Sequence, residues 1–197
     1  MIRPLLALLA LALPTAAAAK VDSQSDIGFA VVHQGTAPLP PAELWKLVVA
    51  PGRWWSKAHS WTGDPENFFL DPQAGGCFCE RIRARADGKI VNRGSVEHMR
   101  VVYADPGKVL RLNGALGPLQ SEAVTGTLTI AMEADGAGTR WSMAYVVGGY
   151  MRYPVAKIAP NVDAVIGEQF ARLQALAGGA AETPAETPAP AAAEPAE

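Results

Sequence analysis

The sequence of 197 residues has little of several features that mark common protein classes. It has only two cysteines, too few for a framework of disulfides or for the cysteine pairs of a structural zinc site. The formal charge is −2 without a block of like charges, which disfavours nucleic-acid binding because such binders normally carry a basic surplus. The longest apolar run, Leu5 to Leu13, is shorter than the roughly 20 residues that span a membrane. These absences leave a single domain of ordinary composition.

Familiar catalytic motifs are also missing. The sequence has no Gly-x-Ser-x-Gly elbow, no His-Glu-x-x-His, no phosphate loop and no dinucleotide-binding glycine triplet. Gly107-Lys108 lies in an expected turn between strands, without the helix start that a phosphate site needs. We therefore expect no cofactor, and no motif marks an enzyme.

The two ends of the chain differ from the part between them. Arg3, the run Leu5 to Leu13 and the small residues that end at Ala19 are typical of a secretory signal peptide cleaved before Lys20. The last residues are rich in Ala, Pro, Glu and Thr, a composition that predicts a disordered tail. We therefore expect a signal peptide at 1–19, a folded domain at 20–178 and a tail at 179–197. The mature protein is then periplasmic or secreted.

Hydrophobic periodicity divides the folded part into strands and helices. A β-rich run at 26–34 precedes a helical pattern that starts at Pro41, and 54–61 is expected to form a second short helix or a turn. From Phe68 onward the pattern alternates, and Asp87-Gly88 predicts a hairpin turn. The strands predicted in this part span 77–85, 89–103, 109–112, 123–134 and 139–147.

A long helix is predicted at the end of the domain. Pro160 is expected to begin or kink it, because proline lacks a backbone donor. Its apolar stripe, which ends at Gly178-Gly179, consists of Val162, Val165, Ile166, Phe170, Leu173 and Leu176. The order of elements predicts an α+β fold. In it an antiparallel sheet of about six to seven strands wraps around the C-terminal helix, with two short helices after the first strand.

A set of turn and packing residues accompanies this order. It comprises tryptophans at 45, 54 and 55, Gly75-Gly76, Gly94-Ser-Val96, Asp105-Pro-Gly107, Gly114-Ala-Leu-Gly-Pro-Leu119, Gly138-Thr139, and Tyr145 followed by Gly148-Gly-Tyr150. With these motifs the chain resembles the START-like helix-grip superfamily, often called SRPBCC, over about residues 26–177. Within it, the chain resembles exported bacterial members near the activator of heat-shock ATPase and the polyketide cyclases. The resemblance implies a deep apolar cavity between sheet and helix that holds lipids, sterols, polyketides or other hydrophobic small molecules.

Strand parity selects the residues expected to face this cavity. Arg81, Arg83 and Arg85 share one side of their strand, which must face solvent because three guanidinium groups do not share a dry core. The neighbouring residues then point inward, as does the apolar side of the last hairpin. The residues expected to bind the ligand are Phe78, Glu80, Leu128, Ile130, Trp141, Met143, Tyr145 and Phe170.

Glu80 is a carboxylate on an otherwise apolar wall. It could orient a ligand hydroxyl, act as a base with a raised pKa, or be held by Ser95 or Arg93 on the adjacent strand. Tyr145 and Trp141 either orient a greasy ligand through one hydrogen bond each or pack as ordinary core. The leading hypothesis is binding of a hydrophobic small molecule. The alternative is a cavity enzyme, cyclase- or dehydratase-like, with Glu80 as acid or base; a partnered carboxylate favours binding and an unpartnered one with a raised pKa favours catalysis.

Cys77, Cys79 and His98 raise the question of a metal. On a regular strand the two cysteine Cβ atoms are about 6 to 7 Å apart, too far for a disulfide. Counting back from the Asp87-Gly88 hairpin places His98 opposite Cys77, an arrangement that suits a soft metal. A fourth ligand is missing, so we expect no metal site.

Other polar and aromatic residues leave alternatives open. Trp54, Trp55 and Trp61 are either a lid at the cavity mouth or an anchor for the short helices. His33 and His59 have no acidic partner nearby in the sequence and are expected to be surface or core polar residues. A co-chaperone role, implied by the family's name, is disfavoured by the signal peptide. The sequence does not specify an oligomeric state.

Overall fold

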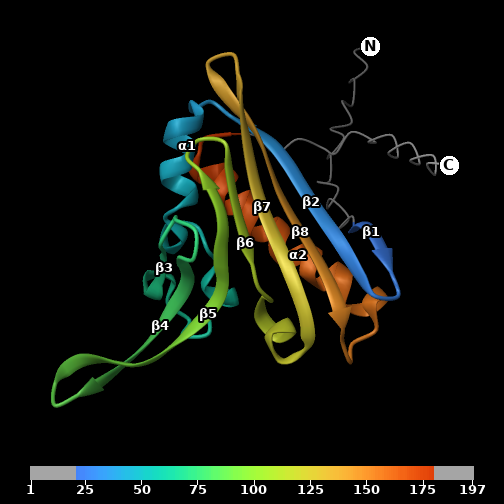
Figure 1. The fold of residues 1–197 in the computed structure, drawn as a ribbon. Coiled ribbons are helices and arrows are strands. Elements are labelled where there is room, and N and C mark those ends of the chain that lie inside the picture. The colour runs from blue at the N-terminus through green and yellow to red at the C-terminus, as the bar shows by residue number, and fades with distance from the viewer. Residues whose placement is uncertain (1–20, 180–197) are drawn as a thin grey trace, which may run out of the picture.

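The computed structural model describes residues 21–179. They form one antiparallel sheet of eight strands in the order β1-β2-β8-β7-β6-β5-β4-β3 (Figure 1). The strands are β1 (Val21–Ser25), β2 (Gly28–Ala37), β3 (Phe68–Leu70), β4 (Cys77–Ala86), β5 (Lys89–Asp105), β6 (Val109–Asn113), β7 (Ala123–Asp135) and β8 (Gly138–Tyr150). The expected signal peptide, and all of the expected tail after its first residue, lie outside the described residues.

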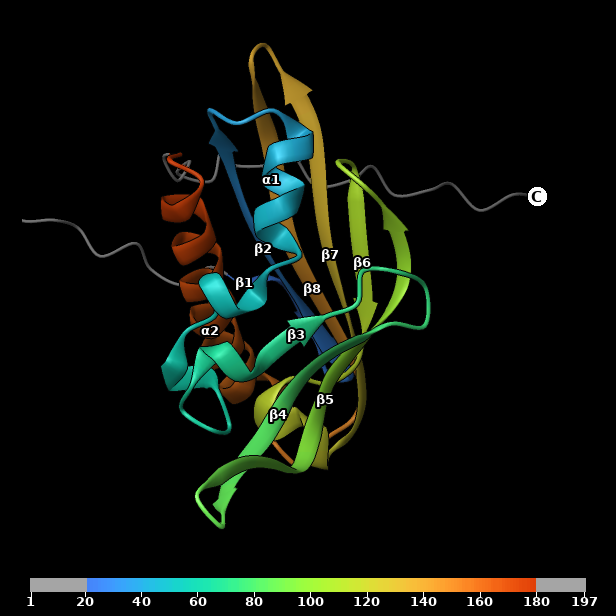
Figure 2. The same cartoon turned by 90° about the vertical axis from the view of Figure 1, so that its left-hand side faces the viewer.

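The helices lie together on one face of this sheet. The 22-residue α2 (Val155–Leu176) runs along the face, and α1 (Pro41–Val48) lies beside it (Figure 2). Four short 3-10 helices complete the described part of the chain: η1 (Pro51–Arg53), η2 (Lys57–His59), η3 (Pro65–Asn67) and η4 (Gly117–Ser121). A sheet that grips a long C-terminal helix is the predicted helix-grip architecture, and the prediction is confirmed.

The structure differs from the predicted elements at both edges of the sheet and at the start of α2. The sheet gains two edge strands that alternation did not reveal: β1, whose side chains are mostly polar and exposed, and β3, which is only three residues long. α2 begins at Val155 rather than at Pro160, which lies inside the helix. The first turn forms where the amides of Lys157 and Ile158 donate to the carbonyl of Pro154. Pro160 therefore removes one hydrogen bond near the start of the helix without setting its boundary.

Alternation along β8 divides core from solvent as predicted. Trp141, Met143 and Tyr145 are buried, whereas Val146 is 54% exposed on the outer face. The indole of Trp141 stacks on Phe170 of α2 with ring centroids 4.3 Å apart. Sheet and helix are therefore in direct contact along this part of the core.

The β4–β5 hairpin carries two irregularities that determine where its side chains lie. Its turn is the predicted Asp87-Gly88, with both φ angles positive, and the hairpin extends beyond the body of the domain (Figure 1). Register shifts lie between Ile82 and Arg83 and between Phe78 and Cys79, and each leaves one extra residue on β5. β-Bulges of this kind re-aim side chains that simple alternation would place elsewhere.

Candidate functional site

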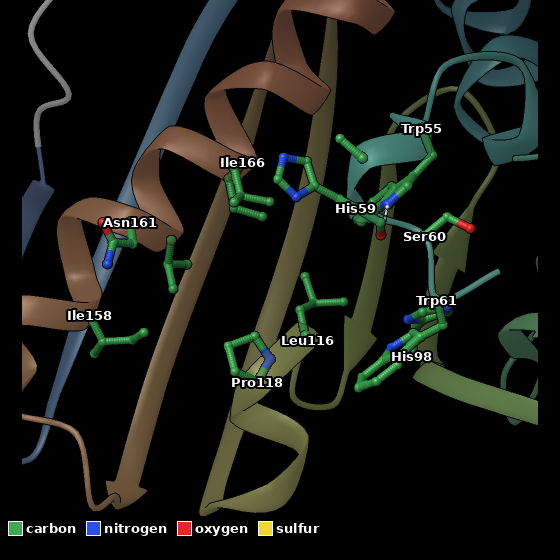
Figure 3. A pocket seen from close by; sticks show the side chains of 14 residues that line it. Trp55, His59, Ser60, Trp61, His98, Leu116, Pro118, Ile158, Asn161 and Ile166 are labelled. Atoms are coloured by element: carbon green, nitrogen blue, oxygen red, sulfur yellow. Dashed lines mark hydrogen bonds between the residues drawn. The ribbon is translucent and has the colours of Figure 1, made fainter. Parts of the chain in front are cut away.

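A pocket of about 470 Å³ lies between the N-terminal half of α2 and the loop around η2 (Figure 3). One wall comes from α2 and consists of Ile158, Asn161, Val162, Val165 and Ile166. The other walls come from the η2 loop, β5 and the start of η4, and consist of Trp55, Ala58, His59, Ser60, Trp61, His98, Leu116, Gly117 and Pro118. The volume of this pocket and its mostly apolar lining are typical of a small-molecule site, since such sites have volumes of about 300–1,000 Å³.

The residues 54–62, here named the tryptophan loop, are fixed to α2. The buried side chain of Gln169 accepts a hydrogen bond from the amide of Ser56 at 2.7 Å. Nε of Arg172 donates to the carbonyl of Trp54 at 2.7 Å, and Nε2 of His59 lies 2.9 Å from Oε2 of Glu168. These contacts hold the loop over the helix and so define the pocket between them.

The far end of the tryptophan loop is fixed to the sheet by Glu80. Oε1 of Glu80 accepts from Ser60 Oγ at 2.7 Å, from the amide of Thr62 at 2.7 Å and from Thr62 Oγ1 at 2.6 Å. Oε2 accepts from the amide of Trp61 at 3.1 Å and lies 3.1 Å from Nε2 of His98. The side chain is fully buried, so this carboxylate has exchanged water for a complete set of protein partners.

These partners bear on two of the alternatives for Glu80, the base with a raised pKa and the pairing with Ser95 or Arg93. Burial raises the pKa of Glu80, but the hydrogen bonds from the side chains of Thr62 and Ser60 and from the loop amides together bring it below its ordinary value. Glu80 is therefore an ionised, partnered carboxylate and not a base with a raised pKa. Ser95 and Arg93 are not its partners: Ser95 pairs with Arg81 in the ladder, and the side chain of Arg93 is exposed.

His98 connects this carboxylate to the pocket. It is the extra residue of β5 at the second bulge, and its ring packs against the rings of Phe68 and Phe78, with centroids 5.1 and 5.2 Å away; those two rings also contact each other. Burial lowers the pKa of His98 below its ordinary value, although Glu80 opposes that shift. A neutral imidazole beside an ionised carboxylate thus lines one end of the pocket.

The eight side chains predicted to bind a ligand do not line this pocket. Phe78, Leu128 and Ile130 border a void of only about 10 Å³, and Trp141 and Phe170 stack on each other. Met143 and Tyr145 are buried elsewhere in the core, and Glu80 is buried where it accepts the hydrogen bonds described above. The pocket between α2 and the tryptophan loop lies beside these residues and not among them, and their role in binding stays a prediction.

The hydroxyl of Tyr145 supports the pocket indirectly. It accepts from the amide of Leu116 at 3.1 Å and donates to the carbonyl of Gly114 at 3.2 Å. Burial raises the pKa of Tyr145 to about 12. Both hydrogen bonds hold the backbone of residues 114–116, where Leu116 lines the pocket. The hydroxyl therefore bonds to the backbone and does not point to a ligand.

The three tryptophans divide between the two predicted roles. Nε1 of Trp54 donates to the carbonyl of Leu47 at 3.0 Å and so anchors the end of α1. Trp55 is buried, donates to the carbonyl of His59 and also lines the pocket. Trp61 lines the pocket while 61% exposed, which places it at the rim. The clustered tryptophans were the sequence signal for this site, whereas Leu116 stood only within the turn motif at 114–119 and was not predicted to bind a ligand.

The prediction that Cys77 and Cys79 lie too far apart for a disulfide is wrong. The structure joins them by a disulfide, with Cα atoms 5.4 Å apart. This separation is shorter than on a regular strand and lies within the usual disulfide range of about 4.4–6.8 Å, so β4 is not fully extended between the two cysteines. The predicted pairing of Cys77 with His98 is also wrong, because the two bulges shift the register until Cys77 pairs with Arg100. Thiolates, not disulfide sulfurs, bind soft metals, and His98 faces Glu80 instead.

The other two histidines have acidic partners that are distant in sequence. His59 faces Glu168, as described above, and Nε2 of His33 on β2 lies 3.0 Å from Oδ1 of Asp163 on α2. Asp163 is fully buried, and the missing side chain of Gly167 leaves room for the His33 ring. The sequence did not reveal these pairs, because each joins α2 to a segment more than 100 residues away.

No family model and no curated protein matches the chain. Among solved structures, Mll3558 from Rhizobium loti is 19% identical with a TM-score of 0.49, over 76% of this chain and 99% of its own. CV1439 from Chromobacterium violaceum is 16% identical with a TM-score of 0.48, over 75% and 96%. Ara h 8.0201 is 13% identical with a TM-score of 0.43, over 74% and 97%. These likenesses concern the path of the chain and assign no ligand or activity.

Within residues 21–179, no helix combines the length and apolar character needed to cross a membrane. α2 is long enough, but polar and charged side chains interrupt its apolar stripe.

Proposed function

We propose that this protein is an exported START-like binding module that takes up a hydrophobic small molecule in the pocket between α2 and the tryptophan loop. The observation that carries the proposal is the pocket itself, about 470 Å³ of mostly apolar space beside a core otherwise in close contact. At about 25 cal/mol per Å² of apolar surface removed from water, burial in such a space supplies most of the affinity. The exposed Trp61 at the rim supports the same interpretation, since large exposed aromatics are often part of a binding surface.

The surroundings of Glu80 favour binding over catalysis by that residue. A general base needs a lone pair free to reach a substrate proton, and the carboxylate oxygens already accept five hydrogen bonds. The carboxylate therefore acts as the anchor that holds the tryptophan loop on the sheet.

Export is part of the proposal. Cleavage before Lys20 would remove no described element, because β1 starts at Val21. A disulfide between Cys77 and Cys79 suits the oxidising conditions of a periplasmic or extracellular location.

A neutral fluorescent probe, N-phenyl-1-naphthylamine, tests the binding proposal. Binding to the parent protein should increase and blue-shift its emission, and Val165→Trp should abolish the signal because the indole fills the pocket from α2. Val146→Trp is the matched control, since Val146 is exposed on the opposite face of the sheet and the same change there should leave binding intact. Equal signals from both variants, or none from the parent protein, would refute the proposed site.

A further inference from the structure

The two ring nitrogens of His98 have different surroundings. Nε2 lies 3.1 Å from Oε2 of Glu80, whereas Nδ1 makes no hydrogen bond among the described residues. The side chain is only 3% exposed and lines the pocket. Nδ1 is not among the fully enclosed polar atoms of the described residues that lack a partner, so it remains accessible at the pocket wall, where an occupant with a hydrogen-bond donor can supply its partner.

The partner on Nε2 determines the chemistry of Nδ1. An ionised carboxylate only accepts hydrogen bonds, so the proton of the neutral imidazole lies on Nε2. Nδ1 then carries a lone pair, and the negative charge of Glu80 behind the ring strengthens it as an acceptor. The two Phe rings restrict the imidazole, so this lone pair is held in place.

We propose that Nδ1 of His98 accepts a hydrogen bond from a neutral hydroxyl group of the ligand, so that the pocket selects mostly apolar alcohols or phenols. The inference rests on the proposed function, because it names the ligand class of the same pocket.

The remaining polar groups of the lining support this class. Ser60 already donates to Glu80, and the amide of Asn161 donates to the carbonyl of Lys157. His59, the other ionisable side chain of the lining, faces Glu168. A carboxylate on the ligand would meet the lone pair of Nδ1 and the charge of Glu80, and an ammonium would lose its hydration in apolar surroundings. A neutral donor avoids both costs.

Three ligands with one apolar body separate these cases: 2-naphthol, 2-methoxynaphthalene and 2-naphthoate, each competing with N-phenyl-1-naphthylamine. The parent protein should bind 2-naphthol about 5- to 10-fold more tightly than 2-methoxynaphthalene, the range expected for one buried hydrogen bond. It should bind 2-naphthoate most weakly. In His98→Phe the preference for naphthol over its methyl ether should disappear, so that both ligands displace the probe equally well. Val146→Trp, on the opposite face of the sheet and outside the pocket lining, is the control and should keep the preference.

Nitrogen-15 NMR of the parent protein gives a second readout that needs no variant. The Nδ1 signal of His98 should have the chemical shift of an unprotonated ring nitrogen and should move on addition of 2-naphthol but not of 2-methoxynaphthalene. A protonated Nδ1, or an unchanged preference in His98→Phe with normal probe binding, would overturn this inference and leave the proposed function standing. Loss of probe binding in the parent protein would overturn both.

Discussion

Oε2 of Glu80 lies 3.1 Å from Nε2 of His98, and the two side chains come from paired strands, one of them at a bulge. The same carboxylate accepts the hydrogen bonds of Ser60, Trp61 and Thr62. One buried anion therefore joins the tryptophan loop, β4 and β5, and the pocket depends on that junction.

Removing this anion should destabilise the fold. Glu80→Ala leaves four part-buried loop donors and the buried His98 without their acceptor, and we expect a loss of about 3 kcal/mol in the free energy of unfolding. Glu97→Ala is the control, because Glu97 is a half-exposed neighbour on β5 whose ion pair with Arg100 lies at the surface, and its loss should cost less than about 1 kcal/mol. Urea unfolding of both variants measures the difference, and similar costs would contradict the role given to Glu80.

Stability should fall on mild acidification. The pKa of His98 is lowered in the folded protein from its ordinary 6.5, so the unfolded chain takes up a proton first as pH falls. The contribution of His98 to stability is complete above about pH 6.5 and is lost as pH falls from there towards the pKa of the folded protein. The free energy of unfolding decreases by up to about 1.4 kcal/mol for each pH unit in that interval. The pKa of Glu80, the titratable group that faces His98, is also lowered, so its own contribution is lost only below about pH 4.5.

Urea unfolding at pH 7.5 and 5.5 measures this dependence. His98→Phe should show a smaller fall than the parent protein between these two values. His33 and His59 remain in both proteins, so the difference reports on His98 alone. The same fall in both proteins would show that His98 is not the group responsible.

Removing the Tyr145 hydroxyl should lower the free energy of unfolding, because this one group makes two hydrogen bonds to the backbone. Tyr145→Phe removes both the donor to Gly114 and the acceptor for Leu116, and we expect a loss of about 2 kcal/mol. Tyr150→Phe makes the same change at a side chain that is 74% exposed and should be nearly silent. Thermal unfolding compares the two, and a silent Tyr145→Phe would show that the hydroxyl does not hold the Leu116 segment.

Export has a direct mass signature. Expression with the natural N-terminus in a bacterial host should yield a periplasmic chain that starts at Lys20. Formation of the Cys77–Cys79 disulfide should lower its mass by two hydrogens and protect both cysteines from alkylation until a reductant is added. An unprocessed cytoplasmic chain would contradict the location.

The sequence predicted those features of the fold that depend on local pattern. Alternation along β8 placed Tyr145 inside, and strand parity placed Glu80 inside, as the structure confirms. The helical stripe included Val165 and Ile166, which line the pocket.

Features that depend on tertiary structure could not be predicted in this way. Two bulges on β5 carry His98 away from Cys77 and towards Glu80, and no pattern in the sequence marks them. The donors to Glu80 come from a loop about 20 residues earlier, and Asp163 meets His33 across the domain. The residues predicted to form the cavity wall are therefore buried in the core. The pocket lies beside them, between α2 and the tryptophan loop, and that loop has no hydrophobic periodicity from which its position could be predicted.

The most direct test of the central claim is a methyl NMR titration with N-phenyl-1-naphthylamine. If the ligand occupies the pocket between α2 and the tryptophan loop, the methyl signals of Ile158, Val165 and Ile166 should shift and saturate together, while those of Leu128 and Ile130 stay unchanged. Shifts centred on Leu128 and Ile130, or no shift at any concentration, would contradict the account.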